Sequence, residues 1–135
     1  MKPIQVQIGV GELADRLTIL EIKERNAPSP AQRARLRREL GRLSRTRERV
    51  GLASPSLDGE IARLRRINAG LWRIEDEIRA CERRRDFGAR FIALARAVYK
   101  QNDRRALVKR RLDERHRSEV RDEKMYRAPG GSSGS

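Results

Sequence analysis

The stretch LDGEIARLRRINAGLWRIEDEIRAC, residues 57–81, decides the fold class. Apolar residues recur along it at heptad spacing, namely Leu57, Leu64, Ile67, Leu71, Ile74, Ile78 and Cys81. Residues at alternating spacings of three and four form one stripe along a helix, as in coiled coils. We therefore predict an amphipathic helix about 40 Å long, whose apolar stripe packs against other helices.

Two helices are predicted before this stretch. From Val10 to Asn26 the apolar residues follow a helical period, with a broad apolar face. Ser29 suits the N-cap of the next helix, and Gln32, three residues on, completes a capping box. That helix runs to Gly51, which suits its C-terminal stop.

A further helix is predicted after the long one. Asp86 suits its N-cap, and its inner face carries Phe87, Phe91, Leu94 and Val98. The polar residues 101–103 interrupt this stripe, so a kink or a new N-cap is expected there. Beyond Arg117 the pattern fades into a polar tail that ends at Tyr126.

The connections between these elements have the length of turns. The predicted fold class is therefore all-α, an elongated antiparallel helical bundle of 4–5 helices with a short N-terminal extended segment. In that segment Ile4, Val6 and Ile8 alternate with glutamines. One strand forms no sheet alone, so the segment lies along the helices, pairs with a second chain, or is merely extended.

The length of 135 residues suits one domain. We assign residues 1–127 to a single helical-bundle domain and residues 128–135 to a disordered linker, which leaves open whether the chain is natural or engineered. Five aromatic residues and 39% charged residues exclude a β-sandwich or a Rossmann-type enzyme. A narrow bundle of this kind leaves apolar surface over, so we expect a homodimer.

Other composition features bear on compartment and cofactors. The single Cys81 forms no internal disulfide and no multi-thiolate metal site, which agrees with a reducing compartment. The sequence has no apolar run of about 18 residues and no signal-peptide pattern. We expect a cytoplasmic protein with no membrane partner, no metal and no cofactor.

The net charge is +14, and its excess is densest between Arg33 and Arg49, where eight arginines stand against two glutamates. A positive potential of this kind attracts polyanions. The candidate polyanion-binding residues are Arg35, Arg38, Arg42, Arg45 and Arg49. In the other, favoured interpretation, these arginines form a solvated face and pair with acids of a partner protein or of the neighbouring helix, namely Glu60, Glu75, Asp76 and Glu77.

The long helix also carries a polar face beside its apolar stripe. Its members, with residues from the next helix, are Asn68, Trp72, Glu75, Asp76, Arg79, Tyr99, Asn102, Asp103 and Lys109. In one interpretation they form a ligand pocket, with Trp72 as a stacking wall, Arg79 for an anion and Glu75 for a hydroxyl group. In the other, favoured interpretation they form a hydrogen-bond and ion-pair network that fixes the register of the helices.

Catalytic signals are weak. His116 is the only histidine, and it follows Arg110 and Arg111 at a spacing that loosely resembles the HEPN ribonucleases. The favoured interpretation is a solvated histidine near a helix end. A chorismate-mutase-like bundle would bind a dianion with the residue types present, but its first-helix arginine pattern is absent. We assign no catalytic residues.

Several motifs resemble those of a small bacterial family of helical proteins of unassigned function. They are GELADRLTILEIK (11–23), IN (67–68) with LWRIEDEIR (71–79), FG (87–88) through FIALARAVY (91–99) to NDRRA (102–106), and Glu123-Lys124 with Tyr126. Some members of that family stand beside or are joined to tetratricopeptide or glycosyltransferase-like proteins. The resemblance implies a helical fold and protein association, and it supplies no catalytic residues. The arginine density of residues 33–49 departs from it, so it implies no nucleic-acid binding.

The leading functional prediction is a non-enzymatic, self-associating interaction or adaptor protein. The alternative is sequence-independent binding of nucleic acid through the arginine-rich helix. A lesser alternative is a small helical-bundle enzyme of the ribonuclease or chorismate-mutase type.

Overall fold

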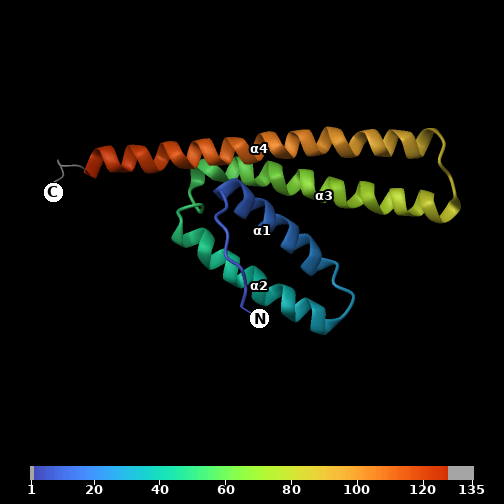
Figure 1. The fold of residues 1–135 in the computed structure, drawn as a ribbon, viewed down its shortest axis with the longest axis horizontal. Coiled ribbons are helices and arrows are strands. Elements are labelled where there is room, and N and C mark those ends of the chain that lie inside the picture. Colours follow the sequence, from blue (N-terminus) through green and yellow to red (C-terminus); the bar gives the residue numbers. More distant parts are fainter. Residues whose placement is uncertain (1, 128–135) are drawn as a thin grey trace.

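The computed structural model describes the backbone of residues 2–127 and the side chains of residues 2–120. The described chain forms four helices: α1 (Val10–Arg25), α2 (Pro30–Arg49), α3 (Pro55–Arg84) and α4 (Ala89–Arg127). α3 and α4 run antiparallel as a long hairpin, and α1 and α2 cover one part of it (Figure 1). The prediction of an all-α bundle is confirmed. The predicted linker, residues 128–135, lies outside the described residues.

α1 is the centre of the bundle, because it packs against each of the other three helices. Leucines of α1 meet apolar residues of α3, of α4 and of the loop after α2. The buried core consists of Leu13, Ala14, Leu17, Leu52, Leu57, Ile61, Leu64, Val108 and Leu112. α2 lies outermost and has no fully buried residue among those described; Leu40 and Leu43 are its partly buried contacts to this core. The described helices include none with the length and hydropathy of a membrane span.

The ends of α2 follow the expected chemistry with one difference. The Ser29 hydroxyl accepts a hydrogen bond from the Gln32 backbone N–H at 3.2 Å, as an N-cap does. The Ser29 hydroxyl also donates to Gln32 Oε1 at 3.5 Å. In a full capping box the Gln32 side chain would accept from the Ser29 backbone N–H, so only half of the box is formed. Gly51 has φ of 77° and follows the helix, which suits a residue without Cβ.

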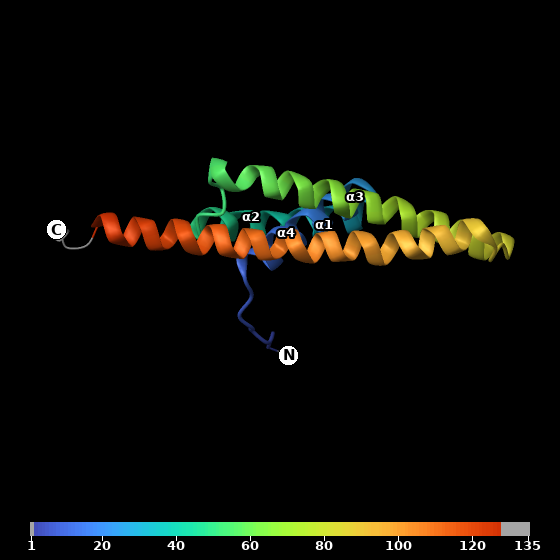
Figure 2. The same ribbon diagram turned by 90° about the horizontal axis from the view of Figure 1, so that it is seen from above.

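α4 differs from the prediction at three places. It begins after Gly88, whose N–H donates to the Asp86 carboxylate at 3.2 Å, so Asp86 precedes the N-cap position. The helix continues through residues 101–103 to Arg127, and Figure 2 shows no break along it. The predicted kink or new N-cap is wrong because Asn102 and Asp103 are exposed, and polar residues on the solvent side leave the backbone hydrogen bonds intact. The polar tail expected beyond Arg117 is also helix.

The far part of the α3–α4 hairpin extends past α1 and α2 (Figure 1). Leu94 and Cys81 are buried there, whereas Phe87 is half-exposed and packs edge-on against Phe91, with ring centroids 5.3 Å apart. The prediction that Phe87 lies on the inner face is therefore wrong. Two helices have no third layer here, so each has an exposed side. Ile92 and Tyr99 are exposed on α4 for that reason.

Residues 2–9 form an extended N-terminal arm without strand pairing in the described chain. Ile4, Val6 and Ile8 are exposed along it. The arm leaves the helical body in Figure 2, which excludes the predicted alternative that it lies along the helices.

Candidate functional site

A buried polar network joins α1, α3 and α4. Its centre is Asp15 on α1, whose side chain is 1% exposed. Arg105 of α4 contacts both carboxylate oxygens, through Nε at 2.9 Å from Oδ1 and through a second nitrogen at Oδ2. Asn68 of α3 donates through Nδ2 to Asp15 Oδ1 at 2.9 Å and to the Thr18 hydroxyl at 2.8 Å. One carboxylate therefore fixes the relative position of three helices.

Lys109 extends this network toward the N-terminus of α1. Its Nζ lies 2.6 Å from Glu12 Oε1 and 3.7 Å from Asp15 Oδ2. One helical turn further along α4, Asp113 Oδ1 accepts a hydrogen bond of 2.9 Å from the Gly11 backbone N–H. Gly9, at the N-cap, makes no side-chain cap, so α4 supplies the cap for α1.

The network shifts the pKa of its acids in one direction. Burial alone raises the pKa of Asp15, but hydrogen bonds from Arg105 and Asn68 and the charges of Arg105 and Lys109 outweigh it, so this pKa lies below its ordinary value. The pKa of Glu12 is also lowered, chiefly by the hydrogen bond from Lys109. The pKa of Arg105 is raised by the hydrogen bond to Asp15. Each group therefore favours its charged form.

We expect the free energy of unfolding to fall as the solution is acidified. The pKa values of Asp15 and Glu12 are lowered in the folded state, so the unfolded chain takes up protons first, near its carboxyl pKa of about 4. The two carboxylates stabilise the folded state above that pH. This stabilisation is lost as the pH falls through their pKa values in the folded state. Urea unfolding between neutral and acidic pH measures this. Asp15→Asn should flatten the dependence, and an unchanged slope in that variant would contradict the assignment.

A cavity of about 310 Å³ lies beside the network, between α1, α3 and α4. Its wall is apolar where Ile19, Ile22, Leu71 and Val98 line it. The polar lining residues are Lys23, Asn68, Trp72, Glu75, Asn102 and Arg105. Four of the nine predicted polar-face residues, Asn68, Trp72, Glu75 and Asn102, therefore line one cavity.

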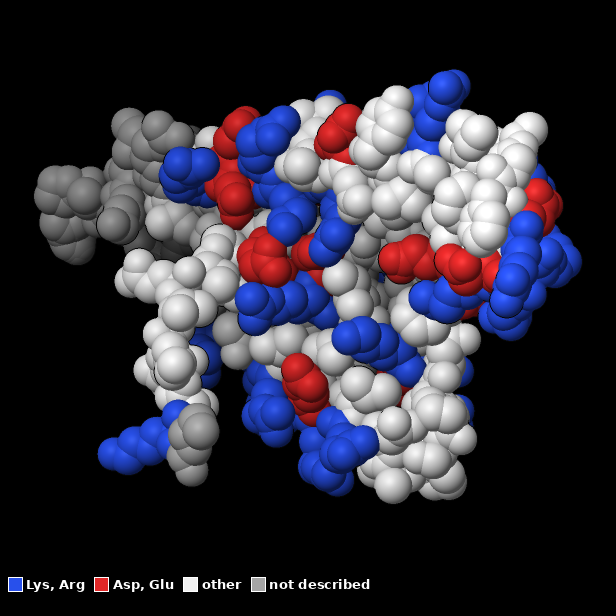
Figure 3. Space-filling model, turned by 45° about the vertical axis from the view of Figure 1, so that its right-hand side comes forward, with Lys and Arg blue, Asp and Glu red and all other residues white. Residues whose placement is uncertain are grey.

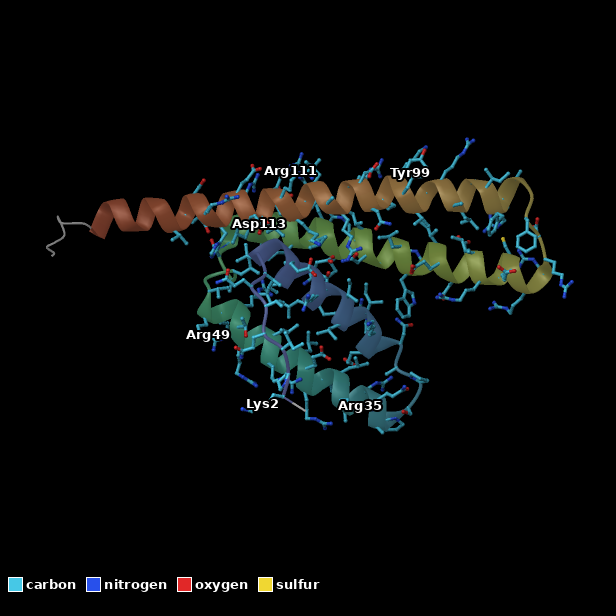
Figure 4. All side chains as sticks on the ribbon, in the orientation of Figure 1. Lys2, Arg35, Arg49, Tyr99, Arg111 and Asp113 are labelled. Carbon is cyan, nitrogen blue, oxygen red and sulfur yellow. The ribbon has the colours of Figure 1, made fainter. Side chains whose placement is uncertain are left out.

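The other five predicted polar-face residues lie elsewhere. Arg79 pairs with Asp76 at 2.8 Å on the exposed surface of α3. Tyr99 and Asp103 are exposed, and Tyr99 points away from α3 in Figure 4. Lys109 belongs to the buried network. No role was predicted for Arg105, although it shares a helix face with Val98, Asn102 and Lys109 at spacings of three and four.

The arginine stripe of α2 consists of Arg35, Arg38, Arg42, Arg45 and Arg49. All five are exposed, and Figure 4 labels the first and last of them at opposite ends of the helix. The spacings of three and four place them along one side of α2 over about 21 Å. Among the described residues, no carboxylate lies within ion-pair distance of any of the five.

The predicted pairing of these arginines with acids of α3 is wrong. Glu60 is buried and lies 3.4 Å from Arg63 and 3.4 Å from Arg115. Asp76 and Glu77 pair with Arg79 and with Arg90, and Glu75 lines the cavity. The physical reason is that α2 packs along α1, whose Glu24 lies near the α2 arginines outside the stripe, Arg33 and Arg37. On the face drawn in Figure 3, acids and bases are interspersed over the middle of the body.

His116 has a structural contact. It is half-buried, and its Nε2 lies 2.6 Å from the Val50 carbonyl oxygen, so the ring N–H donates to the C-terminal end of α2. The prediction of a solvated histidine is therefore wrong. No cluster of three His, Cys, Asp or Glu side chains suitable for a metal occurs in the described part of the chain.

Comparison of this chain with protein-family models, with curated proteins and with solved structures finds no match. The resemblance in motifs therefore stays a prediction.

Proposed function

We propose that this protein is a non-enzymatic binding protein for nucleic acid, which it contacts without sequence preference through the arginine stripe of α2. The observation that supports this most directly is that the five guanidinium groups are exposed and unpaired among the described residues. The four acids of α1 and the first two of α3, Asp58 and Glu60, pair with bases outside the stripe. The positive charge of the stripe is therefore left for an external anion.

The stripe suits a phosphate backbone. Arginine presents a planar fork of donors that matches phosphate oxygens, and it stays charged at any physiological pH. Each phosphate that the stripe neutralises releases condensed counterions, so affinity comes from salt-dependent contacts that carry no sequence information. α2 contains no aromatic residue to stack on unpaired bases, so we propose a duplex as the preferred form.

Arg38→Gln/Arg42→Gln/Arg45→Gln should weaken duplex binding and lower its salt dependence. Because each lost phosphate contact removes about 0.9 from the slope of log K against log salt, the triple variant should lose roughly 3 from that slope. Fluorescence anisotropy of a labelled random duplex, across a salt series, measures both. The matched control is Arg79→Gln/Arg83→Gln/Arg90→Gln, which removes the same formal charge from the far part of the hairpin, where Arg79 and Arg90 are paired.

Each other outcome contradicts the assignment in a specific way. Equal losses in the two triple variants would indicate attraction by net charge alone. Arg104 and Arg111 line a shallow groove between α3 and α4. If the α2 variant binds duplex undiminished and Arg104→Gln/Arg111→Gln loses binding, the site lies in that groove. Absence of binding by the unmodified protein at low salt would end the proposal.

Self-association is the second candidate function. It is favoured by apolar side chains that the bundle leaves exposed, among them Ile4 and Val6 on the arm and Ile92 and Tyr99 on α4. Exposed apolar surface of this kind commonly marks a protein interface. Light scattering over a range of protein concentrations tests it, and a constant monomer mass would exclude it.

A further inference from the structure

The N-terminal arm is the most exposed apolar segment in the described chain. The exposed fractions are 90% for Ile4, 71% for Val6 and 42% for Ile8. No hydrogen bond joins residues 4–8 to any other described residue. In the space-filling view of Figure 3 the arm stands away from the body as a narrow projection at its lower left. The backbone donors and acceptors of this β-prone segment thus have no partner among the described residues.

The sequence of this arm reads the same in both directions. Residues 4–8 are Ile-Gln-Val-Gln-Ile. If two such segments run antiparallel about a two-fold axis at Val6, Ile4 of one copy stands opposite Ile8 of the other, and Gln5 stands opposite Gln7. All the apolar side chains then share one face of the ribbon, and the amides share the other. A two-fold interface requires this kind of self-complementarity.

We propose that the arm pairs with the same arm of a second copy of this chain, as an antiparallel two-stranded ribbon centred on Val6. The inference rests on the second candidate function, self-association, and it names both the segment and the register. It is independent of the arginine stripe.

The position of Pro3 selects one of the two hydrogen-bonding patterns. In an antiparallel ladder, every second residue exchanges both N–H···O bonds with its partner. If Val6 forms a hydrogen-bonded pair with itself across the axis, Ile4 and Ile8 form the other such pairs, and Pro3 falls outside the ladder. The opposite pattern would place Pro3 at a position that needs an N–H, which proline lacks.

Charge also favours a second copy at this segment. Each chain carries a net charge of +14, so contact between two helical bodies is repulsive. Lys2 is the only charged residue among residues 2–9, and the register places the two Lys2 side chains at opposite ends of the ribbon. The arm leaves the helical body (Figure 2), so the paired segment lies outside the body of each copy. The interface is small, so the dimer is expected to be weak and to depend on protein concentration.

Cysteine cross-linking tests the register directly. Val6→Cys should form a disulfide-linked dimer under mild oxidation, because the paired Cα atoms would lie about 5.5 Å apart, within disulfide range. Ile4→Cys alone should not, since its two copies would be about 14 Å apart. An equimolar mixture of Ile4→Cys and Ile8→Cys should cross-link again. The unmodified protein is the control for its own Cys81, which is buried.

Val6→Asp provides the second measurement. It places two carboxylates opposite each other at the axis, so the concentration-dependent dimer seen by light scattering should be lost, while Gln5→Ser leaves it in place. The exposed arm makes both changes neutral for folding, which circular dichroism checks. A dimer that survives Val6→Asp, or equal cross-linking of Val6→Cys and Ile4→Cys, would overturn the ribbon but leave self-association standing. A monomer at every concentration would exclude both.

Discussion

Gly11→Ala is expected to destabilise the protein by about 2–3 kcal/mol, although alanine is the better helix former. A Cβ on Gly11 would lie 2.3 Å from the Lys109 carbonyl oxygen and 2.9 Å from its carbonyl carbon. These are backbone atoms of α4, which no rotamer change removes. α1 must therefore move away from α4, which also disturbs the hydrogen bond from Gly11 N–H to Asp113.

The chain contains a matched control for this change. Gly59 also lies inside a helix, but a Cβ added to it meets nothing within 4 Å. Gly59→Ala should therefore raise the free energy of unfolding by about 0.5–1 kcal/mol, the ordinary gain in helix propensity. Urea unfolding followed by circular dichroism measures both variants. Stabilisation by Gly11→Ala would show that the close approach of α1 and α4 is wrong.

Asp15→Ala should cost about 3 kcal/mol of unfolding free energy, at the lower end of the range for breaking a buried ion pair. The change leaves the Arg105 guanidinium without its carboxylate, and it removes the acceptor of an Asn68 N–H in a buried site. We expect a cost at the lower end because the Arg105 side chain is partly exposed, so water can replace part of the lost interaction with Asp15.

Asp76→Ala is the control for this second prediction. Asp76 also pairs with an arginine, but both partners are exposed on α3. An exposed pair of this kind contributes less than about 1 kcal/mol. Equal costs of the two variants, measured by the same unfolding experiment, would mean that Asp15 is not the centre of a buried network.

The sequence predicted the parts of the fold that depend on local pattern. The heptad stripe of residues 57–81 and the Ser29 N-cap required only spacing and side-chain type, and both occur in the structure. The predicted interruption at residues 101–103 is wrong because local pattern alone does not decide it. An apolar stripe is interrupted both where a helix ends and where the solvent side of a continuous helix is polar, and tertiary packing decides between the two.

The candidate sites were predicted as faces but not as contacts. Asn68 and Trp72 share a helix face, and they line the same cavity. The partnership of Asp15 with Arg105 spans 90 positions, so no periodicity along one helix indicates it. Local pattern also did not indicate which helix packs against α2. Because it is α1 rather than α3, the arginine stripe is left without the acids that its neighbour was expected to supply.

The cap that Asp113 provides for α1 has a consequence for synthesis of the chain. This contact joins residues 102 positions apart, and Arg105 and Lys109 of the same network are also made late. At about 5–20 residues per second, α1 leaves the ribosome about 5–20 s before its polar partners exist. During that interval the Asp15 carboxylate has no cation to accompany it into the core. The Asp15 network and the cap on α1 therefore form only after Asp113 has been translated.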